Sequence, residues 1–307
     1  MRHRNKMFGK GGIAMLPYRP EGLNNPSPGI DKLQRSIGTG DIYEAICIKC
    51  DEHHNLHVDL GTALGIIPRQ EAALGLIEGR TKEYAVLSRV GKPVCFQVTD
   101  VTSEGTAILS RRAAQMEAKD YILSALHPGD IIEAVVQNAA DFGVFCDIGC
   151  GFPALMRIDR CCISRLQKSG DLYFTGQHLH LAVLDINDAQ GQIYLTGREL
   201  LGNWEENAAL FTEGQTVPGV VRSRMPYGLF VELTPNLSGL AEPMDGICPG
   251  DCVSVFIRSI LPSRHKIKLN IIEKIPSVPP RPMRRFIHQS RLEKWEYYPG
   301  SKAFTVF

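Results

Sequence analysis

The sequence predicts a mainly β protein of three tandem five-stranded barrels, with short helical linkers between the barrels and irregular N- and C-terminal tails. The main observation is a pattern in residues 129–151, where a β-branched run, a polar break and a glycine-containing alternating strand follow one another. The same order recurs from Gly40 and from Gly214. Each copy closes in another short strand, at 107–110, 192–196 and 266–270. A tandem array of this kind is more specific than any single match.

The middle copy gives the clearest pattern within one repeat. Its predicted strands are 131–136, 143–148, 154–158, 178–186 and 192–196, and a polar break is expected at 138–141. A loop, 160–176, separates the third strand from the fourth. Five antiparallel strands with an insertion before the fourth predict a closed Greek-key barrel of the OB type, in which the second and third strands form the nucleic-acid face.

The chain divides into seven predicted segments. A linker helix is expected after the first barrel because residues 111–126 are rich in Ala, Met, Glu and Leu and contain no Gly or Pro, and a second is expected within 198–211. Two helical linkers would hold the barrels in a semi-rigid array. The segments are a basic flexible arm (1–36), a diverged barrel (37–112), a linker helix (113–126), a barrel (127–199), a linker helix (200–212), a barrel (213–275) and a tail with Pro, Arg and aromatic residues (276–307).

Positive charge gathers at the two ends. Residues 1–36 hold seven Lys or Arg against two Asp or Glu, and residues 276–307 hold six against two, whereas the whole chain has a formal net charge of +1. The first segment, rich in Pro and Gly, is expected to be a mobile arm that either touches RNA or only aids solubility. The last segment interleaves Arg with aromatic residues, which would either stack on bases or pack against the third barrel.

Several functional classes find no support in the sequence. It has no apolar run long enough for a membrane span and no apolar segment near its start, so a cytoplasmic location without membrane contact is expected. Nine cysteines fit reduced thiols, and Cys47 and Cys50 would point to opposite faces of a strand, so no metal is expected. No nucleophile–base grouping or phosphate-binding glycine loop is present. We expect no enzyme activity, no catalytic residue, no cofactor and no small-molecule substrate.

The middle copy resembles a known family. Its residues GDIIEAVV, DFGVFCDIG and GQIYLTGRE are similar to the S-one domain, the RNA-binding OB barrel repeated in bacterial ribosomal protein S-one. Residues 214–270 resemble the same domain, and residues 40–112 resemble a diverged copy. The whole array is similar to the short S-one-like proteins of low-GC Gram-positive bacteria.

The resemblance implies which residues bind RNA. An aromatic pair on the second strand carries over as Phe142 and Phe145 in the second barrel and as Tyr227 and Phe230 in the third, and becomes His54 and His57 in the first. A strand-three histidine falls at Arg157 in the second barrel but at Glu242 in the third. The acidic turn residue matches Asn187 or Asp188, and the basic position before the last strand becomes Lys266 in the third barrel. Since no barrel keeps the whole set, binding shared across the array is expected.

The third barrel offers a second basic element. Arg222 and Arg224 alternate on its first strand, so their side chains would share a face. Either this strand is simply a solvated charged strand, or it completes one basic and aromatic groove with Tyr227, Phe230, Arg264, Lys266 and Lys268.

Two functions therefore stay open. The first is a non-enzymatic protein that binds single-stranded RNA through stacking and phosphate contacts, with mRNA at the small ribosomal subunit as the partner that the resemblance implies. The second is an adaptor whose barrels bind protein, because the departures from the RNA-binding set and the net acidic body disfavour RNA.

Overall fold

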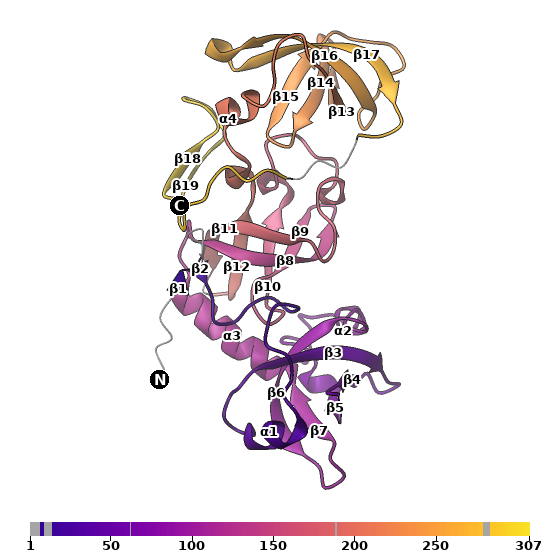
Figure 1. The fold of residues 1–307 in the computed structure, drawn as a ribbon, viewed down its shortest axis with the longest axis vertical. Coiled ribbons are helices and arrows are strands. Elements are labelled where there is room, and N and C mark those ends of the chain that lie inside the picture. The colour runs from indigo at the N-terminus through magenta and orange to yellow at the C-terminus, as the bar shows by residue number, and fades with distance from the viewer. Residues whose placement is uncertain (1–6, 9–13, 62, 188, 279–282) are drawn as a thin grey trace.

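A computed structural model describes the chain except for residues 1–6, 9–13, 62, 188 and 279–282. It is mainly β, and three closed five-stranded barrels follow one another along the long axis of the molecule (Figure 1). The predicted fold class is confirmed. No helix of the described part is both long enough and apolar enough to cross a membrane.

The first barrel contains Leu56, Val58, Phe96 and Leu109 in its core. Its strands pair in the order β3-β4-β5-β7-β6. A 3-10 turn (η1, Arg69–Glu71) and a short helix (α2, Glu83–Leu87) lie between the third and fourth strands. The strands are β3 (Tyr43–Cys50), β4 (Leu56–Asp59), β5 (Leu64–Ile67), β6 (Pro93–Val101) and β7 (Ala107–Ser110).

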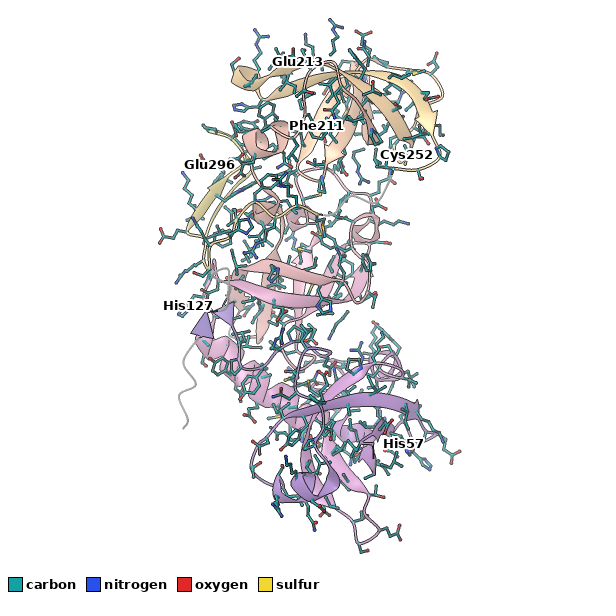
Figure 2. The ribbon with its side chains drawn as sticks, viewed as in Figure 1. His57, His127, Phe211, Glu213, Cys252 and Glu296 are labelled. Atoms are coloured by element: carbon teal, nitrogen blue, oxygen red, sulfur yellow. The ribbon has the colours of Figure 1, made fainter. Side chains whose placement is uncertain are left out.

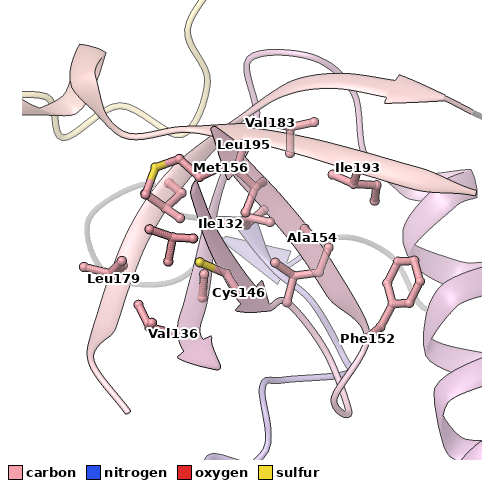
Figure 3. Close-up of a cluster of buried hydrophobic side chains, with 14 of the residues drawn as sticks. Ile132, Val136, Cys146, Phe152, Ala154, Met156, Leu179, Val183, Ile193 and Leu195 are labelled. Carbon is pink, nitrogen blue, oxygen red and sulfur yellow. The ribbon is translucent and has the colours of Figure 1, made fainter. Parts of the chain in front are cut away.

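The second barrel closes around Ile132, Val136, Cys146, Met156 and Leu195 (Figure 3). Its strand order is β8-β11-β12-β10-β9, and pairing of β8 with β9 closes the ring. Two 3-10 turns, η2 (Ile158–Arg160) and η3 (Ser169–Asp171), lie between β10 and β11. The strands are β8 (Ile131–Ala140), β9 (Gly143–Asp147), β10 (Pro153–Arg157), β11 (His178–Asn187) and β12 (Gln192–Thr196).

The third barrel repeats this topology around a core that includes Val221, Val231, Val255 and Leu269. The order is β13-β14-β15-β17-β16, and a 3-10 turn (η5, Pro262–Arg264) joins the last two strands. The strands are β13 (Thr216–Met225), β14 (Gly228–Thr234), β15 (Leu237–Ala241), β16 (Cys252–Leu261) and β17 (Lys266–Ile275).

A β-bulge interrupts the first strand of every barrel at the same place. The register with the second strand shifts at Ile48 in β3, at Gln137 in β8 and at Arg222 in β13. The predicted break at 138–141 is therefore wrong for most of its length, because β8 continues past the bulge to Ala140. Residues beyond a bulge no longer follow the alternation that precedes it.

The two linkers differ from each other. The first is a helix (α3, Arg111–Ala125) whose N-cap Ser110 accepts a hydrogen bond from the backbone N–H of Ala113, and whose buried face includes Ala114 and Ile122. The second is not one helix, contrary to expectation. A 3-10 turn (η4, Arg198–Leu201) ends at Gly202, whose φ of +85° is left-handed, and α4 (Trp204–Ala208) then begins.

The N-terminal segment packs against the barrels where the structure describes it, in contrast to the expected mobile arm. Leu16 and Tyr18 join the core cluster of the second barrel, and Leu33 joins that of the first. The backbone N–H of Cys150 donates to Arg19 O at 2.9 Å. Its elements are β1 (Met7–Phe8), β2 (Ala14–Met15), which pairs with β8, and α1 (Ile30–Arg35).

The C-terminal segment also packs, as one of its two alternatives predicted. Trp295 and Tyr297 enter the core cluster of the third barrel. The backbone N–H of Leu292 donates to Gly129 O at 2.8 Å, so the segment also binds the second barrel. Strands β18 (Lys294–Glu296) and β19 (Phe304–Val306) form a small antiparallel sheet beside α4 (Figure 1). Both described tails thus brace junctions between barrels.

Candidate nucleic-acid interface

One row of outward-facing residues crosses the second, third and fifth strands of each barrel. We call it the outer row. In the second barrel it is Phe145, Leu155 and Tyr194, since Leu155 pairs with both others. In the third it is Phe230, Leu240 and Lys268. In the first it is His57, Ile66 and Ile108. The residues predicted from the sequence at the second strand therefore occupy equivalent positions in all three barrels.

The second barrel presents two perpendicular phenyl rings at the start of its outer row. Phe142 lies in the turn before β9 with 59% of its surface exposed, and Phe145 is half-buried. Their ring centroids are 5.9 Å apart at an interplanar angle of 87°. Gly143, between them in the chain, lets β9 and β10 approach closely, because a Cβ there would lie 2.5 Å from Met156 O. An exposed ring held edge-on by a second ring has a free face on which a base could stack.

One further charged side chain borders this platform. Arg157 ends β10 directly opposite Gly143, and its guanidinium Nε lies 3.0 Å from the Asp159 carboxylate at an exposed site. Asp188, the predicted acidic turn residue, lies outside the described residues.

Tyr194 belongs to the outer row but was not predicted from the sequence. Its phenol donates to Gln192 Oε1 at 2.9 Å, and its half-buried ring extends the outer row beyond Leu155. Gln192-Ile193-Tyr194 aligns with Lys266-Ile267-Lys268, the predicted basic stretch of the third barrel, so an alignment of the copies indicates Tyr194 as well.

The third barrel has a similar aromatic pair with lysines beside it. Tyr227 is 65% exposed, and its ring centroid lies 6.3 Å from that of Phe230 at 85°. Lys268 is exposed at the far end of the outer row, and Lys266 lies two residues before it on the same face. Arg264 is exposed in the turn that precedes β17. Stacking surface and phosphate donors thus occur on one side of this barrel.

Arg222 and Arg224 do not join that groove, so this part of the prediction is wrong. Arg222 is the bulge residue, and its side chain is only 9% exposed. Its guanidinium binds Glu232 through two hydrogen bonds, at 2.8 and 3.1 Å, and Asp171 at 3.3 Å. Beyond the bulge, Arg224 lies opposite the buried Leu229 and donates to Ile247 O at 3.0 Å. The bulge ends the alternation that placed the two arginines on one face.

In the first barrel, the two histidines that replace the aromatic pair are each bound to a carboxylate. The imidazole of His57 lies 3.0 Å from Asp51, and that of His54 lies 3.2 Å from Glu83. The hydrogen bond from His57 is the main cause that lowers the pKa of Asp51 well below its usual range. Figure 2 shows His57 on the barrel at the N-terminal end of the array. Fixed negative charge beside both imidazoles opposes a phosphate at this face.

The described residues hold no group of three or more His, Cys, Asp or Glu side chains placed to bind a metal ion. All nine cysteines lie in the described part and none forms a disulfide. Burial raises the pKa of the Cys161 thiol to about 12 and that of Cys146 further still, so these two thiols stay protonated at neutral pH.

Three closed barrels of this topology, two of them with an aromatic outer row, define a protein of tandem OB-type domains. The chain is similar to small ribosomal subunit protein bS1 of Staphylococcus aureus, with 27% identity over 80% of this chain. It is also similar to the small ribosomal subunit protein bS1 homolog of Bacillus subtilis, with 26% identity over 79% of this chain. The resemblance to S-one-like proteins of low-GC Gram-positive bacteria is confirmed.

The match is partial in length. The chain covers 66% of the Bacillus subtilis protein and 65% of the Staphylococcus aureus protein. No protein-family model matches the chain. Among solved structures, a multidomain protein with nucleic acid binding domains from Streptococcus pneumoniae aligns with 76% of the chain at 14% identity and a TM-score of 0.26.

Proposed function

We propose that this chain is a non-enzymatic protein that binds single-stranded RNA on the outer rows of its second and third barrels. The observation that carries the proposal is a repeated pair of perpendicular rings, one exposed and one half-buried: Phe142 with Phe145, and Tyr227 with Phe230. Bases of any identity can stack on such rings, so weak sequence preference is expected. Arg157, Lys266 and Lys268 supply phosphate contacts, and Arg264 adds a fourth cation.

The junction between these two barrels favours shared binding of one RNA strand. Asn236 is fully buried there, and its amide donates to Arg198 O and to Gly202 O, both at 2.7 Å. Its Oδ1 accepts from the backbone N–H of Ile163 at 3.0 Å. A strand that spans two barrels held in this way loses little further entropy at the second contact, so modest affinities combine into a larger one.

The site of action is proposed to be the small ribosomal subunit, with mRNA as the bound strand. The relatives described above are named small ribosomal subunit proteins. A cytoplasmic location would follow from the same assignment. Because the chain covers about two thirds of those relatives or less, their whole activity is not carried over.

A second candidate function rests on the first barrel. Its His54 and His57 are already paired with carboxylates, and its surface is less suited to phosphate than the others. This barrel would dock a protein, as an adaptor does, while the other two bind RNA. Loss of RNA binding throughout the chain would leave the adaptor role as the better account.

Fluorescence anisotropy with a labelled, unstructured RNA of about 20 nucleotides, a length that spans more than one OB barrel, tests the proposal on the full chain at two salt concentrations. We expect binding that weakens as salt rises, because phosphate contacts release counterions. Absence of binding at both salt concentrations would overturn the proposal.

A further inference from the structure

A cleft of about 830 Å³ opens between the second and third barrels, away from both outer rows. One wall is the outer side of β11 with His178 and His180, and the opposite wall includes Thr234 and Cys252 of the third barrel. Cys252 is labelled in Figure 2 on the third barrel. This volume lies within the range of small-ligand pockets.

Arg285 is one of the residues that line the cleft, and one edge of its guanidinium is buried and unpaired. Its Nε and Nη2 atoms are buried and have no hydrogen-bond partner. The position of the residue is fixed, because the backbone N–H of the following Phe286 donates to Leu200 O at 3.0 Å. Burial lowers the pKa of Arg285, which is the cost of holding this cation without a partner. A buried donor left unpaired costs free energy that a bound acceptor would recover.

The two unpaired atoms have a specific geometry. Nε–H and one Nη–H of a guanidinium point the same way, so together they form a fork that matches two oxygens of a carboxylate or phosphate. A single unpaired donor would suit a water or a carbonyl equally well. The two adjacent donors of Arg285 instead favour an anion with two oxygens side by side, such as a planar carboxylate or a tetrahedral phosphate.

The formal charges around this edge cancel, because Arg285 and Arg222 together offset two carboxylates and Arg19 offsets a third. The nearby carboxylates are already paired, since Glu232 and Asp171 bind Arg222, and Glu133 binds Arg19 at 3.0 Å. His178 and His180 lie on the outer side of β11, where they pair in register with Val135 and Glu133. His180 and Arg285 both line the cleft, where burial and the charge of Arg285 lower the pKa of His180 and Glu133 raises it.

We propose that this cleft binds a phosphate group, held by the two parallel N–H donors of Arg285 and flanked by His178 and His180. Phe174, which also lines the cleft and is 66% exposed, offers a ring for a base or sugar attached to that phosphate. The phosphate belongs either to a free nucleotide or to an RNA chain, and the second source rests on the proposed function. The site shares no residue with the outer rows.

Isothermal titration calorimetry on the full chain with inorganic phosphate and with uridine monophosphate tests the site. Arg285→Met removes the fork, Arg285→Lys keeps only the charge, and Arg284→Met is the matched control because Arg284 is exposed and stacks on Phe286 instead. One bidentate charged pair corresponds to about 10- to 100-fold in Kd. We expect that loss for Arg285→Met, a smaller loss for Arg285→Lys and none for Arg284→Met. Circular dichroism establishes that each variant is folded.

A second arm uses the labelled RNA to distinguish the sources of the phosphate. If neither small ligand binds but Arg285→Met weakens RNA binding about tenfold and Arg284→Met does not, the phosphate comes from RNA. If the folded Arg285→Met and Arg285→Lys variants bind all three ligands with the affinity of the wild type, the site does not exist. A further variant changes Phe142, Phe145, Tyr227 and Phe230 to Ala. If this variant still binds uridine monophosphate, the cleft site is supported even if the outer rows do not bind RNA.

Discussion

The carboxylate of Glu21 lies 2.7 Å from Arg111 Nε and, through its other oxygen, 2.9 Å from Arg111 Nη2. Both side chains are almost fully buried. Glu21 comes from the N-terminal segment, and Arg111 begins the helix between the first two barrels. Arg89 of the first barrel lies 3.3 Å from the same carboxylate, and the backbone N–H of Glu21 donates to Asp147 of the second. One glutamate therefore connects four parts of the chain.

Replacing Glu21 by Gln should strongly destabilise the first junction. The variant keeps the side-chain volume but leaves the guanidinium of Arg111 buried without its counter-charge, and breaking a buried pair costs about 3–5 kcal/mol. Urea unfolding followed by circular dichroism measures the change. Glu52→Gln, at an exposed residue of the first barrel, should stay within about 0.5 kcal/mol of the wild type. Equal stability of the two variants would mean that the N-terminal segment does not brace this junction.

The same junction should make stability depend on pH through Asp147. Burial and the nearby charge of Glu21 raise the pKa of Asp147 to about 7, above the unfolded value near 3.8. Between these two values the folded state holds the extra proton, so the free energy of unfolding falls as pH rises, by at most about 1.4 kcal/mol per pH unit for one proton. Asp147→Asn should lack this contribution to the pH dependence of the free energy of unfolding. Unfolding of both proteins at pH 5 and pH 7.5 tests the prediction, and parallel pH profiles would contradict it.

Arg222→Met should reduce stability and leave RNA affinity almost unchanged. The guanidinium of Arg222 neutralises Glu232 within the third barrel and Asp171 of the second, and its removal leaves two partly buried carboxylates close together. We expect a lower thermal midpoint, part of which Glu232→Gln in the same chain should restore. Thermal unfolding and RNA anisotropy on the same samples separate the two effects. A loss of RNA affinity in a folded Arg222→Met chain would mean that Arg222 contributes to RNA binding, either on the outer-row groove or through the cleft that it lines.

Lys268→Met should lower RNA affinity and leave stability almost unchanged, the opposite of the result expected for Arg222→Met. Lys268 is exposed at the end of the third barrel's outer row, so its loss should lower RNA affinity and reduce the slope of log K against log salt by about 0.7, the value for one single-strand phosphate contact. Stability should hardly change. Lys302, exposed near the C-terminus, gives the control variant Lys302→Met. Identical salt slopes for wild type and Lys268→Met would remove this residue from the interface.

The sequence predicts what is local and repeated in this chain. The three barrels and the positions of Phe145 and Phe230 follow from patterns that recur in each copy. The environment of Arg222 does not, because a bulge changes which way the residues beyond it point and its partner Asp171 belongs to another barrel. The packing of the N-terminal segment was missed for a similar reason. Its Pro-rich composition predicts a loop, but composition does not indicate that Glu21 meets a buried arginine 90 residues later.

The aromatic pairs provide the most direct test of the RNA surface. Each lost stack should cost about 1–3 kcal/mol, so Phe142→Ala with Phe145→Ala should weaken RNA binding, and Tyr227→Ala with Phe230→Ala should do the same in the third barrel. Phe304→Ala removes an exposed ring of β19 that belongs to neither outer row and should leave affinity unchanged. Anisotropy with all three variants ranks the barrels. If only the third-barrel variant loses affinity, the second barrel is not a binding surface. If neither variant does, the rings are not stacking platforms, and the adaptor function becomes the better account of this chain.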